Sequence, residues 1–369
     1  MITIVERDIH SFFKVPFHAY PAQSLYVSPM KSDISRFLSA KTNPLFENDG
    51  DFTFFTAIKN GFPVGRITAH IHRASQILHD PDLAYFGFFD CVNDKDVARL
   101  LLSKAEDFAR QKGMRRISGN FNLTAMQQIG IQTGGFNHQP YTDMVYGPDY
   151  LPAILEQNGY ERFFPMQTIE IDLTALDTSR MSSTQKQQTL LKQGFSFAPI
   201  SRNNLHQRLE EARQILNASF ADNPMFVPVT SEEFQFQAKE MKWIIDPRIS
   251  CLMHYKGEPA GVVIAIPDLN PFLKATKSRL RWSTPWYFLK HHMNRKRAII
   301  ILQGVLPRFQ NMGVNPTMLA HVMRQMKQAG YKSTGGTWIS DSNHASMKQV
   351  KKAGGQPLHQ LHLFCKALA

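Results

Sequence analysis

Residues 305–319, VLPRFQNMGVNPTML, combine the residue types that can hold a phosphate group. Gly313 permits a left-handed backbone, so successive N–H groups can point into one concavity. Pro316 suits the first turn of a helix, where its missing N–H costs nothing. The helix N-terminus adds about half a positive charge, and Arg308 adds a full one. The stretch therefore predicts a phosphate site, although many strand–helix connections contain a single glycine turn.

Charge is distributed unevenly along the 369 residues, whose net charge is +12. Residues 269–369 contain 16 Lys and Arg but only one acid, Asp341, whereas the preceding part of the chain is slightly acidic. This asymmetry favours a polyanionic partner for the C-terminal half. A pyrophosphate-bearing donor, an acidic carrier protein and tRNA are all compatible with it, and a merely solubilising surface is the alternative.

A basic and aromatic segment, residues 273–297, lies within this half. It carries eight Lys or Arg, no acid, and the aromatic residues Trp282, Trp286, Tyr287 and Phe288. Interleaved basic and aromatic residues suit single-stranded nucleic acid, an acidic carrier protein or a membrane surface. An amphipathic helix that packs its aromatic side on the core is the structural alternative.

Two blocks of predicted secondary structure must position these residues, and the blocks have the same order. Each contains a hairpin, a strand, a helix and a further strand, and an Asn-Gly or Lys-Gly pair marks each hairpin turn. The predicted elements are 54–72, 83–92, 94–113 and 114–121 in the first block and 250–270, 297–306, 316–330 and 333–340 in the second. The sequence thus predicts a mixed α/β fold with largely antiparallel sheets, flanking helices and at least one parallel crossover per block.

The length suits two domains, which we expect at residues 1–176 and 195–369, joined by a polar junction at 177–194. No run of about 18 apolar residues is present, and acidic residues interrupt the N-terminal stretch, so we expect a cytoplasmic protein. The three cysteines have no paired spacing, and His70 and His72 have no third ligand at a suitable spacing. We therefore expect no metal site.

The stretch after Leu306 resembles the acyl-CoA loop of the GNAT acyltransferase superfamily, whose pattern is Gln/Arg-x-x-Gly-x-Gly/Ala. Here it reads QNMGVN, residues 310–315, and SDSNHASMKQVKKAGG, residues 340–355, is similar to a later motif of the superfamily. Short pieces at 43–46, 65–72, 134–140, 215–220 and 267–270 further resemble bacterial proteins with two GNAT-like halves, so the resemblance covers nearly the whole chain.

The resemblance implies tandem GNAT-like domains with an acyl-donor site in the C-terminal half. The donor, as acyl-CoA or as the phosphopantetheine of an acyl carrier protein, would contact Val305, Leu306, Arg308, Gln310, Asn311, Met312, Gly313, Val314, Asn315 and Asn343. It further implies that an amine attacks the thioester, and that a backbone N–H near Val305 or Leu306 stabilises the oxyanion.

Few acids are present to act as the base that brings the amine to its neutral form. Asp341 follows a predicted strand and is a catalytic candidate or an N-cap for the next helix. Asp268 and Asn270 end the hairpin strand that should line the acceptor side, and Asp268 is alternatively a turn residue.

Three departures from the superfamily pattern bear on this expectation. Asn315 replaces the usual Gly or Ala, and Val350 replaces a Tyr that protonates the leaving thiolate in many members. In the first block the corresponding connection, residues 90–98, has three Asp and no glycine motif, so we expect it to bind no donor.

The leading hypothesis is an N-acyltransferase that moves an acyl group from a thioester to a small-molecule amine. A tRNA-dependent aminoacyl transferase and a non-catalytic binding protein on the same fold remain as alternatives.

Overall fold

The computed structural model describes residues 1–223 and 225–368, which form two compact units. Unit 1 contains Met1–Gln167, Asn270–Tyr287 and Leu358–Ala369, and unit 2 contains Thr168–Leu269 and Phe288–Pro357. These units are discontinuous in sequence, whereas the domains predicted above are continuous. The last strand groups with unit 1 because Phe364 to Ala367 pair antiparallel with Gly119 to Arg116.

Unit 1 is a mixed sheet between helices. Its strands are β1 (Ile2–Glu6), β2 (Phe52–Lys59), β3 (Phe62–His70), β4 (Leu83–Cys91), β5 (Arg116–Gly119), β6 (Ile131–Gly134), the first part of β7 (Glu161–Asp172) and most of β13 (Gln356–Ala367). Its helices are α1 (Ile9–Ala19), α2 (Lys31–Phe37), α3 (Arg73–Leu78), α4 (Lys95–Gln111), α5 (Leu151–Gln157) and α10 (Asn270–Thr276). The order is β1-β2-β3-β4-β5-β13, and β6 pairs with β13; β4 and β5 are parallel, and the other ladders are antiparallel.

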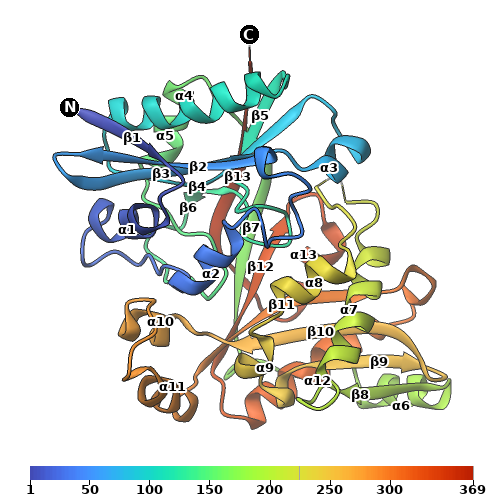
Figure 1. The fold of residues 1–369 in the computed structure, drawn as a ribbon. Helices are drawn as coiled ribbons and strands as arrows, with labels where there is room; N and C mark the ends of the chain where they lie inside the picture. The colour runs from blue at the N-terminus through green and yellow to red at the C-terminus, as the bar shows by residue number, and fades with distance from the viewer. Residues whose placement is uncertain (224, 369) are drawn as a thin grey trace. The chain divides into compact units, whose positions relative to one another are not determined.

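Alternation along β2 explains how α1 and α4 cover opposite faces of this sheet (Figure 1). Phe52 and Phe54 pack with Phe12 of α1, whereas Phe55 and Ala57 pack in the cluster that contains the buried side of α4. Successive side chains of a strand point to opposite faces, so one strand supplies both cores.

Unit 2 repeats the arrangement. Its strands are the end of β7 (Glu161–Asp172), β8 (Phe195–Pro199), β9 (Cys251–Tyr255), β10 (Glu258–Pro267), β11 (Arg297–Val305) and β12 (Ser333–Ser340), in the order β7-β12-β11-β10-β9-β8. Its helices are α6 (Thr184–Lys192), α7 (Leu205–Ser219), α8 (Ser231–Gln237), α9 (Met241–Ile244), most of α11 (Thr284–Met293), α12 (Val314–Gln328) and α13 (His344–Lys352). β11 and β12 are parallel, and the β8–β11 ladders are antiparallel.

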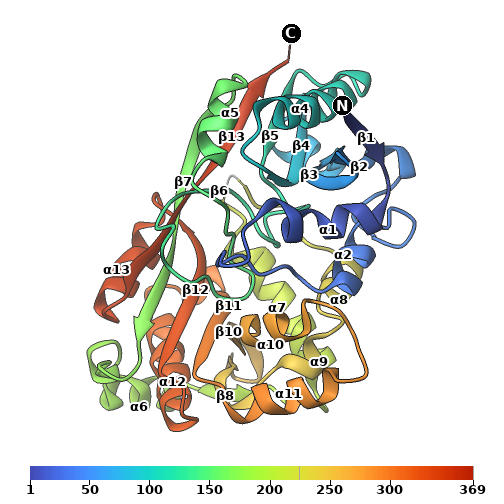
Figure 2. The same ribbon diagram turned by 90° about the vertical axis from the view of Figure 1, so that its left-hand side faces the viewer.

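Helices α12 and α7 pack on opposite faces of the β10–β11 pair (Figure 2). A Cβ added to Gly261 would lie 2.5 Å from Met318 of α12, and one added to Gly304 would lie 2.9 Å from Ser219 of α7. Both glycines therefore allow a helix to approach the sheet closely.

The predicted hairpins are confirmed. Asn60-Gly61 and Lys256-Gly257 each have two positive φ angles, 53° and 80° in the first and 50° and 94° in the second. This is the turn geometry that matches the twist of the flanking strands. Across the described residues, no helix is both long and apolar enough to cross a membrane.

Candidate functional site

The loop between β11 and α12 has the backbone geometry expected of a phosphate cradle. Gly313 has a φ of 89° and is the N-cap of α12, and Asn311 has a φ of 63°. Glycine has no side chain, so the N-cap residue accepts no side-chain hydrogen bond from the first N–H groups of this 15-residue helix. These N–H groups and the helix dipole form a site that favours an anion.

A cationic side chain lies at this helix end. Lys186 of α6 packs against Gly313 so closely that an added Cβ would lie 2.2 Å from Lys186 Cε and 2.8 Å from its Nζ. Arg308 is exposed, and its guanidinium lies 4.7 Å from the centre of the Phe309 ring. Sequence reasoning found Arg308 but missed Lys186, because 127 positions separate it from Gly313 and nothing in the local pattern of α6 marks it.

An amide cluster lies where β11 and β12 separate. The two strands pair only from Arg297 to Ile300 and from Ser333 to Gly336. Beyond this point Gln303 Nε2 donates to Asn315 Oδ1 at 2.6 Å, and Asn315 Nδ2 donates to Gln349 Oε1 at 3.0 Å. The Asn315 side chain is thus turned towards β11 and α13, which explains how the loop accommodates a residue larger than Gly or Ala.

The backbone at the end of β11 distinguishes the two proposed oxyanion donors. Leu306 N–H donates to Ala260 O at 2.9 Å, so it is already engaged by β10. Backbone groups alternate in direction along an antiparallel ladder, so Val305 presents its N–H and C=O to the other side of β11. On that side Ser219 Oγ donates to Val305 O at 3.0 Å. Of the two candidates, the N–H of Val305 therefore remains as the possible donor to the oxyanion.

The acidic candidates occupy different environments. Asp341 is exposed after the end of β12, and Asn343, not Asp341, caps α13 by accepting from Ser346 N at 3.1 Å. Asp268 is buried, with 2% of its surface exposed, and its Oδ2 lies 3.5 Å from Arg297 Nε. The structure thus leaves Asp341 accessible and places Asp268 in a buried ion pair.

Asn270 belongs to unit 1, although it follows Asp268 by only two positions. Its Nδ2 donates to Pro140 O at 3.0 Å, and Thr142 Oγ1 donates to its Oδ1 at 3.4 Å. The side chain is 3% exposed and lines a pocket of unit 1. The structure therefore places Asn270 in unit 1, whereas Val305, Gly313 and Asp341 belong to unit 2.

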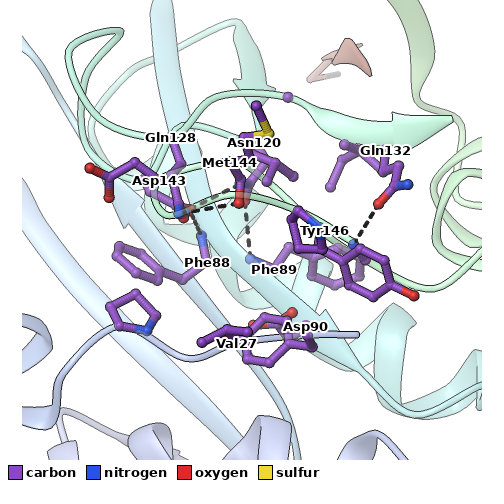
Figure 3. Close-up of a pocket in the computed structure, with 18 of the residues that line it drawn as sticks. Val27, Phe88, Phe89, Asp90, Asn120, Gln128, Gln132, Asp143, Met144 and Tyr146 are labelled. Carbon is purple, nitrogen blue, oxygen red and sulfur yellow. Dashed lines mark hydrogen bonds between the residues drawn. The ribbon is translucent and has the colours of Figure 1, made fainter. Parts of the chain in front are cut away.

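In unit 1 side chains fill the place that corresponds to the separation of β11 and β12. Phe88 N–H donates to Asn122 Oδ1 at 2.7 Å, and Phe89 N–H donates to Asn120 Oδ1 at 3.1 Å (Figure 3). The α4 N-terminus is likewise occupied, because the Asp94 carboxylate accepts from two of its N–H groups. These contacts favour the expectation that no donor binds at residues 90–98.

The pocket of unit 1, with a cavity volume of about 70 Å³, lies beside these asparagines (Figure 3). Amide side chains line it together with apolar ones, and Asp143 lies near it with its carboxylate directed away from Asn120. The amide groups of Asn120, Gln128 and Gln132 are all hydrogen-bonded to other protein groups. Sequence reasoning did not find this pocket because its residues come from distant segments.

A buried ion pair forms one wall of this pocket. Arg66 is 1% exposed, and its Nε donates to Asp90 Oδ2 at 2.8 Å. Tyr20 Oη donates to the other carboxylate oxygen, and Arg66 also donates to Tyr26 Oη at 2.9 Å. Burial and the neighbouring Asp90 raise the pKa of Tyr20, so this phenol stays protonated and continues to donate.

His70 ends β3, whereas His72 lies beyond the strand as the N-cap of α3, and both histidines are buried. His70 Nε2–H donates to Leu123 O at 2.8 Å, and burial lowers the pKa of His70 to about 3 and that of His72 to about 4. Within residues 1–223 and 225–368, no group of three His, Cys, Asp or Glu is arranged to hold a metal ion.

We expect His70 to make unit 1 sensitive to acid. An imidazole whose pKa is lower in the folded than in the unfolded protein opposes folding once the pH falls below about 6.5, and the penalty grows until the folded pKa is reached. When the pH is lowered from about 7.5 to about 4.5, the free energy of unfolding should fall in both proteins. The fall should be about 2 kcal/mol smaller in His70→Gln than in the parent protein. Hydrogen exchange of unit 1 amides at both pH values measures this. The exposed control His138→Gln should behave like the parent, and equal losses in all three proteins would contradict the assignment.

Two curated proteins are similar to the chain in sequence over nearly its whole length. No family model matches the chain. A bacterial ceramide synthase from Caulobacter vibrioides is 27% identical, over 98% of this chain and 95% of that protein. Protein YghO from Escherichia coli is 24% identical, over 98% of this chain and 94% of that protein.

Solved structures resemble the chain over its whole length. A tandem GNAT protein from the clavulanic acid biosynthesis pathway superimposes with a TM-score of 0.58 at 10% identity, covering 100% of this chain and 99% of that one. A GCN5-related N-acetyltransferase from Sphaerobacter thermophilus gives a TM-score of 0.53 at 10% identity, covering 99% and 96%. A fungal GCN5-related glucosamine N-acetyltransferase region gives 0.60 at 12% identity, covering 99% of this chain and 38% of a longer one. The resemblance seen in the sequence is confirmed at the level of the fold: the chain has a mixed α/β fold similar to that of a tandem GNAT protein.

Proposed function

We propose that the protein is an N-acyltransferase that uses a thioester donor, either acyl-CoA or an acylated carrier protein. The observation that carries this proposal is the contrast between the two units. The α12 N-terminus begins at a left-handed glycine beside Lys186, whereas the α4 N-terminus is occupied by the carboxylate of Asp94. Only the former arrangement suits the phosphates of a donor.

In the proposed reaction an uncharged amine attacks the thioester carbonyl. A C–N bond forms, the C–S bond breaks, the amine loses a proton and the departing thiolate gains one. Val305 N–H would stabilise the oxyanion, a contribution worth about 10²–10³ in rate for one such donor. Asp341 is the proposed base, since it is exposed, whereas Asp268 is buried against Arg297.

The relative from Caulobacter vibrioides suggests the class of acceptor. A ceramide is the amide of a fatty acid and a long-chain amino alcohol, so a ceramide synthase forms the kind of bond proposed here. We therefore propose a lipid amine as the acceptor, in place of the unspecified small-molecule amine that the sequence supports.

The test is an assay for amide formation. The full chain is incubated with a long-chain amino alcohol and either a fatty acyl-CoA or an acylated carrier protein, and the product is measured by mass spectrometry. Asp341→Asn should lower the rate by about 10²–10⁴, the usual contribution of a general base. The control Asp222→Asn changes an exposed acid on another segment and should keep the parent rate.

Other results would favour the alternatives. Amide formation that requires an aminoacyl-tRNA would replace the thioester donor by the tRNA-dependent reaction. Binding of CoA without turnover of any amine would favour a binding protein on this fold.

A further inference from the structure

Residues 277–297, which we call the 277–297 segment, expose an unusual concentration of large apolar side chains. The exposed fractions are 70% for Leu280, 96% for Trp282, 59% for Trp286, 56% for Leu289 and 68% for Met293. These are five of the 13 large hydrophobic residues that are exposed in the described part of the chain, and they fall within 14 positions. The other eight are dispersed singly or in one adjacent pair, as is normal for a protein surface.

The exposed apolar residues of α11 lie on one face of the helix. Trp286, Leu289 and Met293 have the spacing i, i+3 and i+7, which places them along one stripe. His291 lies on the inward side, where its Nε2–H donates to Asp268 O at 2.8 Å, and no residue of this ten-residue helix is buried. Trp286, Leu289 and Met293 thus face outward, while Tyr287 and Phe288 are half-buried on the side of His291.

The turn before α11 is held in place, so the exposure of Leu280 and Trp282 is a built feature. Ser278 is 2% exposed, its Oγ donates to Ser28 O at 2.5 Å, and its carbonyl accepts from Lys31 N at 2.9 Å. The next residue, Arg279, lies with its guanidinium 5.3 Å from the centre of the Phe13 ring. These contacts anchor the start of the turn to unit 1.

Exposed cations precede and interrupt the apolar residues along the chain. Lys274, Lys277, Arg281, Lys290 and Lys296 are exposed, and the chain has no acid between Asp268 and Asp341. Each Lys or Arg near an anionic lipid surface adds electrostatic attraction. The charge of the segment is therefore complementary to an anionic surface.

The apolar residues identify the kind of anionic surface. Nucleic-acid sites stack bases on aromatic rings, but Leu280, Leu289 and Met293 offer no ring. Trp residues prefer the headgroup level of a membrane, and aliphatic residues on the same helix face enter the acyl boundary. We propose that the 277–297 segment docks the protein on an anionic membrane surface, with the α11 stripe and Trp282 inserted. This surface is independent of the proposed reaction.

Vesicle sedimentation of the full chain tests the proposal. The protein should sediment with vesicles that mix phosphatidylcholine with phosphatidylglycerol and much less with phosphatidylcholine alone. The variant Trp282→Ser/Trp286→Ser/Leu289→Ser should lower the partition coefficient at least about tenfold, because it removes the inserted side chains. The matched control Trp243→Ser removes a tryptophan of the same 59% exposure from α9 and should sediment like the parent.

A second measurement separates insertion from plain electrostatic attraction. Vesicles brominated in the upper acyl chain should quench the tryptophan fluorescence of the parent, and the triple variant should lose this quenching. The proposal is overturned if the triple variant binds vesicles as well as the parent does. It is also overturned if the segment binds an acidic carrier protein or an oligonucleotide and the protein does not bind the vesicles. Neither readout requires turnover, so a failure of the proposed acyltransferase activity would be seen separately.

Discussion

Replacing Gly313 with aspartate should abolish the stabilisation of the protein by coenzyme A. A ligand at 100 times its Kd stabilises the folded state by about 2.7 kcal/mol, and this increment should disappear in the variant. The new carboxylate would stand at the α12 N-terminus, where the phosphates are proposed to bind, and would contact Lys186 directly. Thermal unfolding with and without coenzyme A measures the increment, and calorimetric titration of the parent should give one binding site per chain.

The opposite end of the same helix supplies a matched control. Gly330 follows the C-cap of α12, has a φ of 87° and has no atom within 4 Å of an added Cβ, so Gly330→Asp introduces similar backbone strain far from the loop. This control should keep the full increment from coenzyme A. If both variants keep the increment, the phosphate site does not depend on Gly313 and the donor assignment is wrong. If both variants lose it, the loss is not specific to the loop and gives the donor assignment no support.

The sequence was sufficient for the elements that local chemistry determines. The Asn60-Gly61 and Lys256-Gly257 pairs specify two-residue turns, as the structure confirms. The left-handed backbone expected of Gly313 is also observed, although α12 begins at Val314, two residues before the predicted start at residue 316. Each of these depends on the backbone preference of one or two residues, so a short stretch of sequence carries the whole signal.

Features that depend on distant pairing were not predictable in this way. β13 pairs with β5 across more than 240 positions, and its period-2 pattern would suit any antiparallel partner. Two other features also depend on contacts between residues far apart in the sequence. Lys186 packs against Gly313, and two asparagines accept hydrogen bonds from the Phe88 and Phe89 N–H groups. The composition of residues 273–297 indicated an unusual surface, but only the structure shows that Trp286, Leu289 and Met293 of α11 are exposed.

We expect the largest loss of stability from breaking the buried ion pair of unit 1. Asp90→Asn should lower the free energy of unfolding of this unit by about 3–5 kcal/mol, the usual effect of leaving one buried charge uncompensated. Arg66 would keep its charge at 1% exposure while losing the carboxylate, and Tyr20 would lose a charged acceptor. Hydrogen exchange of the β3 and β4 amides measures the change within unit 1, which is preferable to a single melting temperature for a chain of two units.

A double variant distinguishes the loss of a charge partner from a general loss of packing. Arg66→Met keeps an extended side chain between Phe12 and Phe88, whose ring centres lie 4.9 and 5.7 Å from the guanidinium. Removing both charges in Arg66→Met/Asp90→Asn should restore much of the stability lost in Asp90→Asn, because no charge is then left unpaired. A double variant as unstable as the sum of the single variants would show that shape and hydrogen bonding, rather than charge compensation, make this pair necessary.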